Sequence, residues 1–172
     1  MAARRSIVLN DSPESKVDSQ PTTLSRILVP IDGSTNSTRA LNVACNLAKF
    51  SGAELMILNV IPTPGILVEA PVGFGLPPGG ISEYYNRQEE NAENVVGQAV
   101  SVCKEQGIKN VATQITRADK SIVEEIIDSA TRKNIDLIVI GTRGLGGFKK
   151  LLLGSVSSGV VTHASCDVYV VR

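Results

Sequence analysis

Two patterns of apolar residues alternate along the chain. Short continuous apolar runs have the length of strands that are covered on both faces. Longer stretches repeat apolar residues at helical spacing, which places one stripe toward a core. The predicted strands are 26–32, 54–60, 111–116, 137–140 and 168–171, and the predicted helices lie at about 40–51, 82–106, 122–130 and 155–164.

Turn residues mark where several of these elements begin and end. Residues 33–37 are rich in N-cap candidates, and Ser51-Gly52 closes the first helix. Ser121 and Glu124 have the spacing of a capping box ahead of the third helix. Residues 62–80 contain five Pro and five Gly, and this density predicts a long irregular loop.

Strand and helix alternate throughout, which predicts an α/β fold. The expected architecture is a single open five-stranded parallel sheet with helices on both faces. We expect a flexible polar tail at residues 1–25 and one domain at residues 26–172. In such folds a ligand binds at the carboxyl ends of the strands, where the strand order reverses.

Composition excludes several classes of function. Lys and Arg balance Asp and Glu, so the formal net charge is zero and a uniformly basic nucleic-acid binder is not expected. Aromatic residues make up only 3%, which disfavours a stacking platform for single strands. No apolar run approaches the roughly 18 residues of a membrane span, so neither nucleic acid nor a membrane is an expected partner.

The cysteines and the N-terminus predict a cytoplasmic protein. Cys45, Cys103 and Cys166 are widely spaced, which suits a reducing compartment, and we expect each to be a small buried apolar residue. Near the N-terminus, Ile7-Val8-Leu9 is too short for a secretory signal, and the acids Asp11 and Glu14 argue against a transit peptide.

The segment after the fourth strand has the features of a phosphate site. Its glycines let the backbone approach a ligand, and Gly154-Ser155 begins a helix whose first N–H groups are unpaired. No Asp or Glu occurs between Leu137 and Cys166. The alternative is an ordinary loop with turn glycines and a Ser cap. The P-loop and dinucleotide patterns are both absent. The residues concerned are Gly141, Gly144, Gly146, Gly147, Gly154 and Ser155, with Arg143, Lys149 and Lys150 among them.

The spacing of Gly141, Gly144 and Gly154-Ser155 resembles the signature of the ATP-binding branch of the universal stress protein family. The opening segment 27–34 and the closing segment 168–172 are also similar to that family, in the same order along the chain. The resemblance covers residues 26–172. It implies a strand order of 3-2-1-4-5, with a nucleotide at the switch point between the first and fourth strands.

The resemblance also implies which residues contact the nucleotide. Asp32 would contact the base or ribose, where the alternative is an Asx turn that caps the next helix. The backbone of Val60 would bind the adenine edge. The ligand would be ATP, or AMP or another adenine nucleotide, with Mg or Mn bridging the phosphates. The implied set is Pro30, Asp32, Val60, Gly141, Gly144, Gly154, Ser155 and Val156, with no catalytic residue and no protein metal ligand.

These features favour a nucleotide-binding regulatory protein of the stress response over an enzyme. His163 is the only histidine, and we expect it to have a structural place on the last helix. Two alternatives remain: a nucleotide-free dimeric interaction module and a slow ATPase. The last strand should lie at a sheet edge, and an apolar edge together with the family resemblance predicts a homodimer through it.

Overall fold

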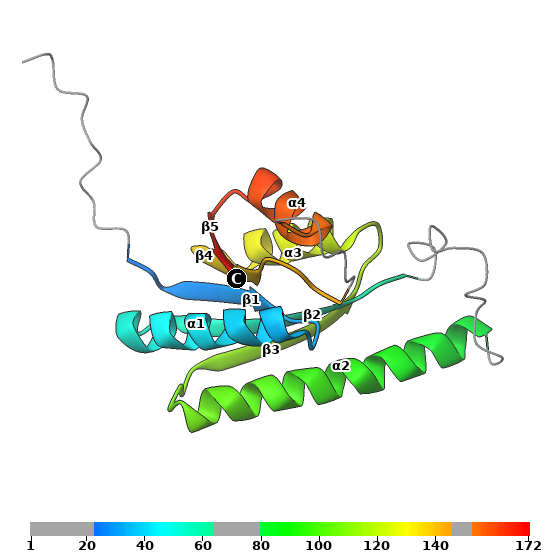
Figure 1. The fold of residues 1–172 in the computed structure, drawn as a ribbon, viewed down its shortest axis with the longest axis horizontal. Coiled ribbons are helices and arrows are strands. Elements are labelled where there is room, and N and C mark those ends of the chain that lie inside the picture. Colours follow the sequence, from blue (N-terminus) through cyan, green and yellow to red (C-terminus); the bar gives the residue numbers. More distant parts are fainter. Residues whose placement is uncertain (1–22, 64–79, 146–152) are drawn as a thin grey trace, which may run out of the picture.

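The computed structural model describes residues 23–63, 80–145 and 153–172. Within them strands and helices alternate as predicted (Figure 1). All strand pairs are parallel, and the sheet order β3-β2-β1-β4-β5 confirms the expected order. The elements are β1 Arg26–Pro30, α1 Thr35–Ser51, β2 Glu54–Ile61, α2 Gly80–Glu105, β3 Val111–Arg117, α3 Ile122–Arg132, β4 Leu137–Gly141, α4 Ser155–His163 and β5 Asp167–Val171.

Most of the predicted tail and of the predicted 62–80 loop lies outside the described residues. At the edge of the tail, the backbone N–H groups of Ser25 and Arg26 donate to Asp136 Oδ2, each at 2.8 Å. At the far end of the loop, Gly80 already belongs to α2, two residues earlier than the predicted start.

The helices form two layers, one on each face of the sheet (Figure 1). The α1 and α2 helices pack on one face, in a core cluster that contains Ile27, Val29 and Ile57. The α3 and α4 helices pack on the other face, in a cluster that contains Leu28 and Leu58. Successive strand residues point to opposite faces, so the continuous apolar runs supply both clusters at once.

Local turn chemistry sets the helix boundaries. Ser34 Oγ accepts from Ser37 N and caps α1, and Gly52 ends the helix at φ 75°. Ser121 Oγ accepts from Glu124 N at 3.0 Å and caps α3, as the predicted capping box requires. Gly107, at φ 79°, lies just beyond α2. The helix bounds lie within two residues of those expected from the sequence, except that α1 begins at Thr35, ahead of the expected start at about residue 40.

The long helix α2 is amphipathic. Its buried stripe consists of Tyr84, Ala92, Val96, Ala99 and Cys103, while acidic residues such as Glu90 and Glu93 are exposed. Among the residues that the structure describes, no helix is both long enough and apolar enough to cross a bilayer.

Candidate functional site at the switch point

The sheet order places the carboxyl ends of β1 and β4 side by side. Ile27 and Leu28 are in register with Leu137 and Ile138. The turn after β1 and the glycine-containing segment after β4 therefore leave the sheet at the same end, where the strands have their carboxyl ends. This is the position where an open parallel sheet binds its ligand.

Asp32 joins these two segments. Its Oδ1 atom accepts from Ser34 N at 3.0 Å, and its Oδ2 atom accepts from Leu145 N at 3.1 Å. The first bond is the Asx turn that the sequence offered as an alternative role for Asp32. The second bond spans 113 positions and ties the segment after β4 to the turn after β1. Each carboxylate oxygen has a second lone pair, which a ligand hydroxyl or amine can use.

Two of the predicted glycines are required by close packing around this junction. A Cβ atom added at Gly141 would lie 2.8 Å from the backbone C and O of Asn36, at the start of α1. A Cβ atom added at Gly144 would overlap the Asp32 carboxylate. Both glycines therefore let β4 and its following turn approach the turn after β1.

The start of α4 is anchored to the end of β4 through one carbonyl group. Thr142 O accepts from Gly154 N at 2.7 Å and from Ser157 Oγ at 3.0 Å. Gly154 occupies the N-cap and has no side chain to accept from the first-turn amides. Those amides have no acceptor within the helix, so they are available to an anion. Ser155, next to them, is exposed.

Pro30 lies at the end of β1 and Val60 near the end of β2. Pro30 is in register with Leu58, and both Pro30 and Val60 are partly exposed. Beside them, the buried Asn59 donates from Nδ2 to Ile31 O at 2.8 Å and fixes the two strand ends together. The eight predicted site residues are Pro30, Asp32, Val60, Gly141, Gly144, Gly154, Ser155 and Val156, and the structure brings all of them to the carboxyl ends of β1, β2 and β4.

The sequence prediction missed Thr142, Ser157 and the amide of Leu145. Ser157 stands three residues after Gly154, the spacing at which a hydroxyl folds back on a helix start, and this signal could have identified it. Thr142 and Leu145 form these bonds through backbone atoms, so their residue types give no signal of the contacts. Lys149 and Lys150 lie outside the described residues, while Arg143 is half-buried.

Other features of the described residues do not belong to this site. His163 is exposed at the end of α4, and its Nδ1 atom lies 2.9 Å from Gly159 O in the same helix. No group of three His, Cys, Asp or Glu side chains within these ranges could hold a metal ion. A cavity of about 540 Å³ beside β3 includes Arg117 and Arg132, which pair with Glu89 and Glu125.

Comparisons with known proteins show the family and the fold. Residues 23–172 match the model of the Universal stress protein family. The chain belongs to this family. Universal stress protein YxiE of Bacillus subtilis is 34% identical over 148 residues, which are 86% of this chain and 98% of YxiE. The solved structure of universal stress protein UspA from Lactobacillus plantarum has 28% identity and a TM-score of 0.74, and the match covers 88% of this chain and all of UspA.

Two further solved universal stress proteins share the fold at lower identity. One, in complex with cAMP, has 23% identity and a TM-score of 0.61 over 86% of this chain and 96% of its own. The other, from Archaeoglobus fulgidus and in complex with dAMP, has 20% identity and a TM-score of 0.62 over 87% of this chain and 99% of its own.

Proposed function

We propose that this universal stress protein binds an adenine nucleotide at the switch point between β1 and β4. The observation that carries the proposal is the start of α4, where the uncapped helix terminus at Gly154 is anchored beside the turn that Asp32 holds. The backbone N–H groups of that terminus would bind the phosphates. The adenosine would lie toward Asp32, Pro30 and Val60.

The more specific proposal is ATP with a bridging Mg or Mn ion. Both oxygens of Asp32 already accept backbone N–H groups. The cation would bind the phosphate oxygens, which commonly coordinate Mg²⁺ in nucleotide sites. Support for an adenine base comes from the family, because two solved relatives hold cAMP and dAMP. Binding of this kind suits a regulatory protein whose bound state follows the adenine nucleotide supply.

The experiment is to identify and then titrate the ligand. Mass spectrometry of the small molecules released from the purified, denatured protein is expected to show an adenine nucleotide. Calorimetry of the ligand-free protein with ATP, AMP and cAMP, with and without Mg²⁺, then ranks the ligands, with GTP as the control for the base. If no nucleotide is released and the ligand-free protein does not bind ATP at millimolar concentration, the proposal is rejected in favour of a nucleotide-free module. Phosphate release over many turnovers would instead favour an ATPase.

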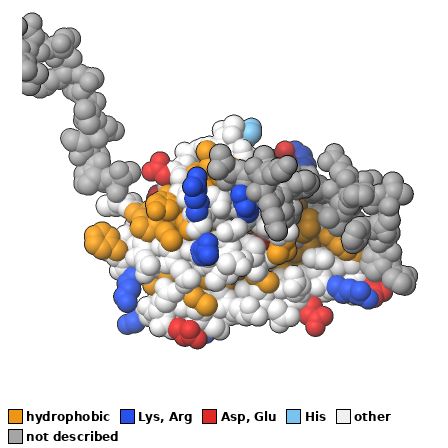
Figure 2. Space-filling model, in the orientation of Figure 1, with side chains coloured by type: hydrophobic (Ala, Val, Ile, Leu, Met, Phe, Trp, Pro, Cys, Tyr) orange, Lys and Arg blue, Asp and Glu red, His pale blue; other side chains and the backbone are white. Residues whose placement is uncertain are grey.

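We also propose that two copies associate through β5. This strand ends the sheet order, and its residues alternate between exposed and partly buried positions. Tyr169 is 51% exposed and Val161 of α4 is 47% exposed. Figure 2 shows hydrophobic side chains on the part of the surface where β5 lies in Figure 1. Light scattering at micromolar concentration is expected to give the mass of a dimer, and a monomeric mass would reject this association.

A further inference from the structure

Two cysteine thiols from distant parts of the chain meet in the core. Cys45 belongs to α1 and Cys103 to the last turn of α2, and both side chains are completely buried. Their Sγ atoms lie 3.3 Å apart, although the residues are 58 positions apart in sequence. The sequence predicts each cysteine to be a small buried apolar residue, and burial is confirmed for Cys45 and Cys103, whereas Cys166 is only partly buried. Contact between two thiols adds a chemistry that apolar packing does not need.

We propose that Cys45 and Cys103 form a reversible disulfide that links α1 to α2, with a hydroperoxide as the oxidant. A disulfide requires its sulfur atoms to approach to about 2.05 Å. The sulfur atoms are already in contact and the two helices lie against each other, so only a short further approach is needed. The proposal is independent of nucleotide binding, since neither cysteine belongs to the candidate site.

The contact also assigns the two thiols different roles. Either thiol can donate in this contact, and with Cys45 as the donor the hydrogen bond lowers the pKa of Cys103 below its usual value. The same bond, together with burial, raises the pKa of Cys45. Cys103 also lies in the last turn of α2, so opening of the helix end exposes its sulfur, and as the thiolate it attacks the oxidant first.

The reaction then proceeds in two balanced steps. The Cys103 thiolate attacks the outer oxygen of hydrogen peroxide, which breaks the O–O bond and gives a sulfenic acid and hydroxide. Cys45 sulfur next attacks the Cys103 sulfur, and the sulfenic oxygen leaves as water with the Cys45 proton. Two thiols are thereby oxidised by two electrons, and one peroxide is reduced to two waters. A dithiol reductant reverses the link by exchange.

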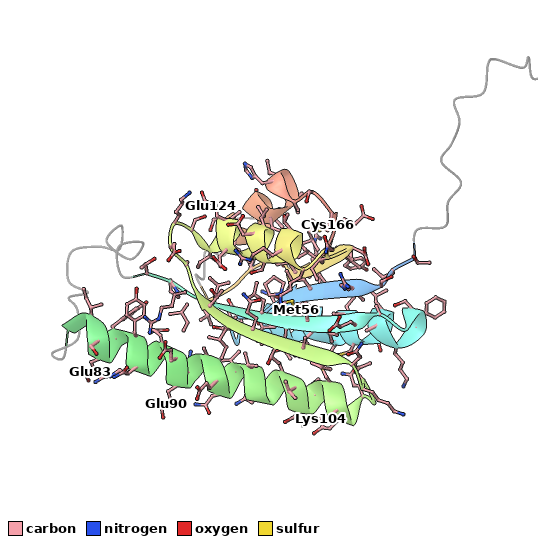
Figure 3. The ribbon with its side chains drawn as sticks, turned by 180° about the vertical axis from the view of Figure 1, so that it is seen from behind. Met56, Glu83, Glu90, Lys104, Glu124 and Cys166 are labelled. Carbon is pink, nitrogen blue, oxygen red and sulfur yellow. The ribbon has the colours of Figure 1, made fainter. Side chains whose placement is uncertain are left out.

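Access to the buried pair is available through the end of α2. Cys103 lies two residues before the helix ends at Glu105, and helix termini open at lower free energy than helix centres. The opening would break the hydrogen bond that Gln106 Nε2 donates to Asn42 Oδ1 at 2.7 Å, which holds this end of α2 on α1. Lys104, beside Cys103, is exposed and marks the same end of α2 in Figure 3. Opening of this last turn would therefore expose Cys103 without unfolding the sheet.

The test uses the full chain with Cys166 replaced. Cys166 packs against the opposite core cluster, on the other side of the sheet from α2 (Figure 3), so Cys166→Ala removes the third thiol without touching the pair. After hydrogen peroxide treatment, the mass is expected to fall by two hydrogen atoms, and a digest should contain one peptide that joins Cys45 to Cys103. Dithiothreitol should restore both thiols.

A matched variant separates the roles of the two cysteines. Adding Cys45→Ala to the Cys166→Ala protein leaves Cys103 without a partner, so its oxidation should stop at a sulfenic acid that dimedone traps.

In the protein that keeps both cysteines, closing the loop between Cys45 and Cys103 should raise the thermal midpoint by roughly 8–16 °C. The proposal is overturned when peroxide-treated Cys166→Ala protein, unfolded and alkylated, still shows both thiols free. A link that forms only in denaturant overturns it as well.

Discussion

The substitution Gly154→Asp separates helix stability from nucleotide binding. Gly154 has extended backbone dihedrals at the N-cap of α4, φ −73° and ψ 162°, which any residue can adopt. An Asp there would accept from the first-turn amides, which are the proposed phosphate ligands. The added Cβ atom would lie 3.2 Å from Thr142 O, a tight contact that a small shift relieves. We therefore expect the folded state to be retained.

The expected loss of affinity follows from charge. A carboxylate about 4 Å from a phosphate charge, at an effective dielectric constant near 20, is repelled by about 4 kcal/mol. Because each 1.4 kcal/mol is tenfold in affinity, the Kd for ATP should rise about a thousandfold. Thermal unfolding of the ligand-free variant should show a stability change of only a few tenths of a kcal/mol, since Gly and Asp differ little at an N-cap.

The matched control is Gly154→Asn, which has nearly the same shape and the same capping ability without the charge. It loses amide donors to its own side chain, so its affinity for ATP should fall about tenfold. Calorimetry of the three proteins gives the binding free energy of ATP for each, and the difference between the Asp and Asn variants is the effect of the added charge. Equal affinities for the two variants, or wild-type affinity in a folded Asp variant, would refute the placement of phosphate at this helix start.

Four other substitutions test the fold, the site and the proposed dimer contact. Gly141→Ala should lower the free energy of unfolding in urea by about 1–3 kcal/mol, because its Cβ atom meets the backbone of Asn36, whereas Gly97→Ala on the open face of α2 should raise it by about 0.5–1 kcal/mol. Asp32→Asn leaves one acceptor oxygen for two amides, so stability should fall by about 1 kcal/mol and hydrogen exchange at Leu145 should accelerate; unchanged exchange would contradict the role given to Asp32. Tyr169→Lys should give a monomer by light scattering, because the association of two copies would bring like charges together at β5.

The sequence predicted the elements of this fold well because their signals are local. A capping serine and a closing glycine bound α1, and continuous apolar runs identify strands that are buried on both faces. The strand order came from the family resemblance, since the alternation of elements alone is compatible with other orders of a parallel sheet.

The contacts that complete the candidate site were harder to predict from the sequence. Asp32 could be singled out as a polar residue at a strand end, but its bond to Leu145 N depends on two segments that meet only when β1 pairs with β4. Thr142 contributes a carbonyl oxygen, which every residue has. The contact between Cys45 and Cys103 depends on how α1 and α2 pack, and no spacing within either helix encodes it.

The bond from Leu145 to Asp32 would link the proposed nucleotide binding to the lifetime of the protein. Because its partners are 113 positions apart, this part of the proposed site exists only in the fully paired sheet and is absent from the unfolded chain. A ligand that binds only the native state adds stability in proportion to the logarithm of its concentration, about 2.7 kcal/mol at one hundred times Kd. Falling nucleotide levels would then release the chain to proteolysis, so its abundance would follow the energy supply without a separate degradation signal.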